Sequence, residues 1–174
     1  QLAIWALAGC TDPLSLEPLR QALKSDQSEV VATAARALAL RQDKTSSARL
    51  CALLSASQPQ VRRAAADALA RCGQVEAVSA LLDSLTTGPD PFLKHALIHA
   101  VYRIASKEQL LAALEYRHPA VQRCALVLLD QHPDGGITND AVMARLGATD
   151  EALRQSALRI LMRHPEWAED AQAL

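Results

Sequence analysis

A period of about 30 residues runs through this chain of 174 residues and restricts its fold more than any other feature. Five segments repeat one pattern, in which an apolar residue is followed by others four and eight positions later, and the segments are 31, 31, 29 and 32 positions apart. The triplets are Val30, Ala34 and Leu38; Val61, Ala65 and Leu69; Phe92, Ala96 and Ala100; Val121, Ala125 and Leu129; and Leu153, Ala157 and Leu161. Residues four positions apart share one face of an α-helix, so each triplet predicts the core-facing side of a long helix.

A second, shorter helical pattern precedes each of these segments. The shorter helices are expected over 13–24, 44–56, 75–87, 107–116 and 138–147. Each period is therefore an antiparallel pair of helices, and neighbouring pairs must stack because one pair cannot bury its apolar face alone. We predict an all-α chain of about eleven helices, folded as a right-handed α-solenoid with the longer helices on its concave side.

The same period predicts the domain organisation. One repeat domain is expected over 1–174, with five to six helix pairs. The predicted repeats cover 12–41, 44–73, 75–106, 107–133 and 137–164, with a partial repeat over 1–9 and the start of a further helix over 165–174. Because both ends stop within a helical pattern, we expect a segment truncated at both ends, taken from a larger multidomain protein.

Composition and charge narrow the classes of function. Hydrophobic residues make up 50% of the chain but aromatic residues only 3%, which disfavours an all-β fold. The formal net charge of −1 removes the general electrostatic argument for nucleic acid or an anionic membrane. No apolar run approaches the roughly 20 residues that span a bilayer, so we expect no membrane contact from this segment.

Three segments carry a resemblance to a known family. They read QPQVRRAAADAL over 58–69, HPAVQRCA over 118–125 and DEALRQSA over 150–157. Each resembles the second helix of a HEAT repeat, and the resemblance covers nearly the whole chain. It implies a helical scaffold that binds other proteins rather than an enzyme.

A narrower resemblance rests on the segment DPFLKHALI, over 90–98. It is similar to a phrase in the HEAT regions of planctomycete-type membrane-bound dehydrogenases, bacterial proteins that also carry a haem-binding cytochrome c module. That phrase usually has an acidic residue where this chain has Lys94, and the haem signature Cys-x-x-Cys-His is absent from this sequence. The resemblance implies an exported or cell-envelope protein whose haem and enzymatic activity lie outside this segment. Otherwise a cytoplasmic location is expected.

His95 and His99 form a weak candidate metal site. Two histidines one helical turn apart can present both imidazoles to a metal ion. A catalytic zinc helix would also need a glutamate beside the first histidine, where this chain has Ala96. The alternative is structural: the equivalent positions of other repeats are small or apolar, which predicts partly buried histidines between repeats. We expect no cofactor.

Arg63, Lys94 and Arg123 are the candidate partner-binding residues, and we call these three the basic ridge. They lie two positions after the first residue of their triplets, on the side of the helix that faces away from the core. Further cations near the ends of the long helices are Arg71, Arg103 and Arg163. The basic ridge predicts an acidic peptide, a carboxylate-rich partner or phosphate as the ligand. The alternative is an ordinary solvated surface, with ion pairs to acidic neighbours such as Asp67 and Asp130.

No catalytic constellation emerges from the sequence. It has no Gly-rich phosphate loop and no Gly-x-Ser-x-Gly motif. The cysteines form no Cys-x-x-Cys pair and are expected to be small buried side chains; they are Cys10, Cys51, Cys72 and Cys124. The leading hypothesis is therefore a non-catalytic protein–protein interaction or scaffolding module that binds a partner on its concave face. The alternatives are a HEAT-like DNA glycosylase or other nucleic-acid-binding solenoid, and a bilin-lyase-like HEAT protein.

Overall fold

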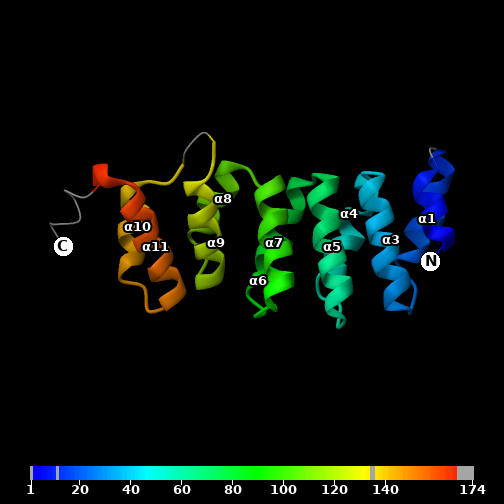
Figure 1. Ribbon diagram of the computed structural model, residues 1–174, viewed down its shortest axis with the longest axis horizontal. Helices are drawn as coiled ribbons and strands as arrows, with labels where there is room; N and C mark the ends of the chain where they lie inside the picture. Colours follow the sequence, from blue (N-terminus) through cyan, green and yellow to red (C-terminus); the bar gives the residue numbers. More distant parts are fainter. Residues whose placement is uncertain (1, 11, 134–135, 168–174) are drawn as a thin grey trace. The chain divides into compact units, whose positions relative to one another are not determined.

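The computed structural model describes residues 2–10, 12–133 and 136–167, and these residues form eleven α-helices and four short 3-10 helices without any strand. This confirms the predicted all-α class and the expected number of helices. The chain separates into two compact units, residues 1–105 and residues 106–174, and each is described by itself. The boundary between the units falls within one residue of a predicted repeat boundary. Figure 1 shows the helices of each unit, coloured along the sequence.

Unit 1 consists of helix pairs in which the second helix is the longer. Its helices are α1 (Leu2–Gly9), α2 (Leu16–Ala22), α3 (Ser28–Leu40), α4 (Ser47–Leu53), α5 (Pro59–Cys72), α6 (Val78–Leu85) and α7 (Pro91–Ile104). The 3-10 turns Pro13–Ser15, Lys44–Ser46 and Val75–Ala77 lead into the short helices. Each short helix packs against the long helix that follows it, and α1, α3, α5 and α7 pack in a row (Figure 1).

Local sequence explains where the long helices begin and end. Pro59 and Pro91 occupy the first positions of α5 and α7, where a proline lacks only an amide proton that would have no partner anyway. The Asp90 carboxylate caps α7 by accepting hydrogen bonds from the amides of Phe92 (2.9 Å) and Leu93 (3.1 Å). Gly73 ends α5 with a φ of 66°, a left-handed conformation that suits glycine.

Small side chains fill the core between the long helices. Ala34 in α3 and Ala65 in α5 are completely buried, as the triplets predict. Alanine at these positions lets neighbouring helices approach closely, while Leu38 and Leu69, also completely buried, fill the remaining space.

Of the triplet predicted for α7, Ala96 and Ala100 are buried as expected, but the first residue is wrong. Phe92, assigned to the core by the pattern, is 73% exposed, whereas Leu93 is 1% exposed. Because α5 and α7 both have 14 residues and both begin with proline, their equivalent positions are 32 residues apart and not 31. Leu93 therefore takes the place of Val61 at the start of the buried face.

Unit 2 contains two further helix pairs. Its helices are α8 (Lys107–Ala113), α9 (Pro119–Asp130), α10 (Asn139–Leu146) and α11 (Glu151–Arg163), followed by the 3-10 turn Pro165–Trp167. The long helices α9 and α11 pack against each other, and Ala125 and Ala157 are completely buried, as predicted. Of the further helix expected over 165–174, residues 168–174 lie outside the described part of the chain.

Polar contacts join successive helix pairs. The buried Asp43 carboxylate accepts hydrogen bonds from Arg20 Nη2 (2.6 Å), Arg20 Nε (3.0 Å) and Ser46 Oγ (2.5 Å). The hydrogen bonds from Arg20 and Ser46 hold the pKa of Asp43 below its usual value. This ion pair connects α2 with the loop after α3, and thus one helix pair with the next.

A second polar cluster connects the ends of α9 and α11 in unit 2. His164 lies between two carboxylates, with its Nδ1 2.8 Å from Glu166 Oε1 and its Nε2 3.0 Å from Asp130 Oδ1. The hydrogen bond with Glu166 raises the pKa of His164 above its usual value, and the hydrogen bond with Asp130 adds to this effect. Asp130 also forms an ion pair with Arg163, and the His164 ring stacks on Trp167 with 4.0 Å between ring centroids.

Candidate interaction surface

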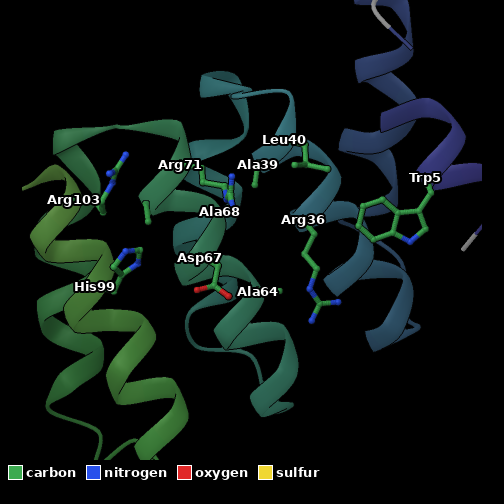
Figure 2. A pocket seen from close by; sticks show the side chains of 11 residues that line it. Trp5, Arg36, Ala39, Leu40, Ala64, Asp67, Ala68, Arg71, His99 and Arg103 are labelled. Atoms are coloured by element: carbon green, nitrogen blue, oxygen red, sulfur yellow. The ribbon is translucent and has the colours of Figure 1, made fainter. Parts of the chain in front are cut away.

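A hollow of about 660 Å³ lies on the long helices of unit 1. Its lining comes from α1, α3, α5 and α7, which are far apart in the sequence but adjacent in the stack (Figure 2). The long helices therefore present one continuous surface, which is the side on which a partner was predicted to bind.

Two rows of side chains cross the hollow, because equivalent positions of successive long helices recur at the repeat spacing. The lower row is Trp5, Arg36, Asp67 and His99. The upper row, one helical turn further along, is Leu40, Arg71 and Arg103. Figure 2 shows the two rows side by side, with Arg103 above His99 on α7 and Arg71 above Asp67 on α5.

Positive charge dominates this hollow. Arg36, Arg71 and Arg103 face a single carboxylate, that of Asp67. All four side chains are exposed, and no ion pair involves any of them in the part of the chain that the structure describes. The three guanidinium groups are thus free to bind an anion from outside the chain.

Apolar side chains flank the charges at one end of the hollow. Trp5 is 45% exposed and Leu40 is 57% exposed, so both offer apolar surface to a partner. A smaller hollow of about 500 Å³ lies beside the first and is lined by Arg63, Phe92, His95 and their neighbours. The surface therefore combines cations with exposed aromatic and aliphatic groups, a composition that is common at protein interfaces.

The three residues of the basic ridge differ in exposure and do not all belong to one unit. Arg63 is exposed beside the smaller hollow, but Lys94 is partly buried. The prediction that Lys94 lies in the same row as Arg63 is wrong, because the one-residue shift of α7 puts His95 there. Arg123 belongs to unit 2 and is also only partly exposed. An arginine commonly lays its methylene groups along apolar surface, which covers part of the side chain. Partner binding by these residues stays a prediction.

The position of Lys94 has a different structural role in other long helices. The side chains at the equivalent positions donate hydrogen bonds to backbone carbonyl groups just after the preceding short helix. Arg62 Nε donates to Leu54 O (3.1 Å), Gln122 Nε2 to Tyr116 O (2.6 Å) and Arg154 Nη1 to Ala148 O (3.0 Å). The three carbonyls lie one to three residues beyond the ends of α4, α8 and α10, so these bonds fix the turn inside each pair.

His95 and His99 are both exposed, and the prediction that they lie partly buried between repeats is wrong. The same shift of α7 explains this: His95 corresponds to Arg63 and His99 to Asp67, both of which are exposed positions. Among the residues that the structure describes, no group of three or more histidine, cysteine or acidic side chains could hold a metal ion. Metal binding by the two histidines alone stays a prediction.

The cysteines differ in their exposure. Cys72 and Cys124 are buried, as predicted, whereas Cys51 is half-buried and Cys10 is exposed. Burial raises the pKa of the Cys72 thiol to about 11 and also raises the pKa of Cys51. Both thiols therefore stay protonated near neutral pH, where a thiol is a poor nucleophile.

Sequence reasoning does not single out Trp5, Arg36 or Leu40, although a signal for them exists. Trp5, Arg36 and Asp67 recur at intervals of 31 residues, the repeat spacing itself. Following every exposed position at that spacing, and not only the position of the basic ridge, would have brought these residues together.

Comparison with known proteins supports the repeat architecture. Residues 16–101 match the family model of HEAT repeats. Among solved structures, the complex of CpcE and CpcF of phycocyanin lyase from Nostoc sp. PCC7120 is 22% identical, with a TM-score of 0.56 over 91% of this chain and 68% of that chain. No curated protein matches the chain.

Two engineered proteins from a structural genomics consortium are also similar. One is 23% identical, with a TM-score of 0.50 over 94% of this chain and 85% of its own. The other is 25% identical, with a TM-score of 0.50 over 90% of this chain and 49% of its own. At these identities the likeness bears on the fold, and the resemblance of residues 90–98 to planctomycete-type proteins stays a prediction. Residues 16–101 are therefore similar to HEAT repeats, and the structure and these neighbours agree on an all-α chain of helix pairs.

Proposed function

We propose that this chain is a non-catalytic interaction module that binds an acidic segment of a partner protein in the hollow of unit 1. The observation that carries the proposal is the set Arg36, Arg71 and Arg103, exposed on three neighbouring helices without an ion pair among the described residues. Trp5 and Leu40 beside them offer an apolar anchor point.

The chemistry of the lining supports binding rather than catalysis. None of the described residues that line the hollow is a serine, threonine, cysteine or lysine, and its Asp67 and His99 are outnumbered by three arginines. Arginine pairs with carboxylates through two parallel hydrogen bonds, and complementary charge also accelerates association. HEAT repeats offer such side chains on an extended surface, which suits a protein partner.

Binding can be measured through Trp5, because the chain contains only two tryptophans and the other is Trp167. A Trp167→Phe variant makes the emission report on the hollow alone. We expect a peptide of glutamate, proline and leucine to change this emission, with an affinity that falls as salt is added. The combined variant Arg71→Glu and Arg103→Glu should weaken binding by about ten-fold or more.

The control is the combined variant Lys24→Glu and Lys44→Glu, which makes the same change in charge at exposed positions away from the hollow. Its affinity should stay within about two-fold of the parent, since distant exposed charges are screened by salt. Equal weakening by both variants would refute the site. Tighter binding of a single-stranded oligonucleotide than of the peptide would favour a nucleic-acid-binding solenoid instead.

A bilin-lyase-like function is the second candidate, because the fold is similar to that of the phycocyanin lyase complex. The hollow lies within the size range of small-molecule sites, which is roughly 300–1,000 Å³. Arg71 and Arg103 could hold the carboxylates of a tetrapyrrole, and Asp67 could accept hydrogen bonds from its pyrrole nitrogens. A change in the absorption spectrum of biliverdin on mixing, lost in Asp67→Asn and without any peptide binding, would favour this candidate.

A further inference from the structure

The upper row has a regular geometry that restricts the conformation of a bound segment. Arg71 and Arg103 are the thirteenth residues of helices that begin at Pro59 and Pro91, and Leu40 ends the neighbouring helix α3. The row therefore runs across three helices that pack side by side. Axes of packed helices lie about 8–10 Å apart, so successive members of the row are separated by a similar distance.

A partner side chain must recur at that distance on one face of its own backbone. A polyproline II segment has three residues per turn and rises about 3.1 Å per residue, so every third side chain faces the same way about 9.3 Å apart. In a β-strand, side chains on one face are roughly 6.6 Å or 13 Å apart, which fits the row poorly. An α-helix reaches about 10.5 Å only after seven residues, and a short isolated helix is marginally stable in water.

We infer that the hollow recognises an acidic segment in the polyproline II conformation, with an apolar residue and two acidic residues spaced three positions apart. This inference rests on the proposed function. In this arrangement the apolar residue contacts Leu40 and Trp5, the first acidic residue pairs with Arg71, and the second pairs with Arg103. Figure 2 shows the four side chains of the hollow that the segment would meet. A polyproline II segment has no internal hydrogen bonds and is a common form of unfolded chains, so little ordering opposes binding.

Asp67 adds selectivity to this arrangement. It lies one helical turn from Arg71 on α5, and it is the only carboxylate among the described residues that line the hollow. An acidic side chain directed to the lower row would meet this like charge, whereas one held in the upper row meets an arginine. A segment with acidic residues at every position therefore binds less tightly than its total charge suggests.

The test uses three peptides of equal length and composition, each with one leucine and two glutamates among prolines and glutamines. The spacing between these three residues is two, three or seven positions. At low salt we expect the spacing of three to bind about five-fold tighter than the others, since two correctly placed exposed ion pairs contribute modestly. Trp5 emission in the Trp167→Phe protein provides the measurement.

A charge swap identifies which glutamate meets which arginine. Arg103→Glu should weaken binding of the spacing-three peptide, and a peptide whose glutamate farther from leucine is replaced by lysine should recover it. The control peptide carries lysine in place of the nearer glutamate and should not recover it. Equal recovery by both peptides would overturn the assignment.

The outcomes separate this inference from the proposed function. Tightest binding at a spacing of two or seven, or equal salt-sensitive binding of all three peptides, overturns the inferred polyproline II conformation. The proposal of an acidic partner would still hold in that case. Binding of none of the peptides, with a folded protein by circular dichroism, overturns both.

Discussion

Replacing Leu93 and Phe92 separately by alanine tests the position of α7 in the stack. The two residues are adjacent and both are apolar, so the repeat pattern alone assigns Phe92 to the core. The structure reverses this order, since Leu93 is 1% exposed and Phe92 is 73% exposed. We predict that Leu93→Ala strongly destabilises unit 1 and that Phe92→Ala does not.

The expected magnitudes follow from burial. Leu93→Ala removes a buried side chain and leaves a cavity, which costs about 2–5 kcal/mol in comparable cores. Phe92 has only about a quarter of its surface removed from water, so its loss should cost less than about 0.8 kcal/mol. The higher helix propensity of alanine offsets roughly half a kcal/mol of that loss. The two variants should therefore differ by at least about 1.5 kcal/mol.

Urea unfolding followed by far-ultraviolet circular dichroism measures this difference. The midpoint should fall clearly for Leu93→Ala at an unchanged slope, which indicates a change in stability rather than in the unfolded state. Phe92→Ala should stay near the parent midpoint. Equal midpoints, or a larger loss for Phe92→Ala, would refute the 32-residue match between α5 and α7.

Three further predictions concern packing and charge. Ala65→Leu and Ala125→Leu should each destabilise by roughly 1–3 kcal/mol through overpacking, while Ala52→Leu, the same change at an exposed site, should alter the urea midpoint little. Asp43→Asn should destabilise by about 1–3 kcal/mol in urea unfolding, since it weakens a buried ion pair whose arginine is partly solvated. The pKa of His164 is raised in the folded protein, so its contribution to the free energy of unfolding is complete below the ordinary value of 6.5 and is lost as pH rises through the folded pKa. His164→Gln should abolish that part of the pH dependence of the urea midpoint. An unchanged pH profile would contradict this prediction.

The repeat architecture could be predicted from the sequence because it depends on the spacing of alanine and leucine. Ala65 and Ala125 are completely buried where the triplets place them. The pattern fails at α7, since Phe92 and Leu93 are both apolar and periodicity cannot choose between them. The start of the helix decides, and Pro91 marks it 32 residues after Pro59.

The candidate site was less accessible to sequence reasoning for a related reason. Arg63 lies on the exposed side of its helix, as predicted. Lys94 does not take the equivalent position in α7, because the pattern was aligned one residue too early there. The hollow itself depends on which exposed positions of different helices face one another. Those neighbours are set by the packing of the long helices against one another. The sequence of one helix alone, such as α1 with Trp5 or α3 with Arg36, does not reveal them.

The ion pair between Arg20 and Asp43 joins residues that are only 23 positions apart in the sequence. This short separation has a mechanical and an evolutionary consequence. In unit 2, the hydrogen bond between His164 and Asp130 joins residues that are 34 positions apart, also close to one repeat period. Within unit 1, each long helix packs against its immediate neighbours in the row. A chain held in this way should lengthen under tension in separate steps, and duplication of one period within it should leave every other junction intact.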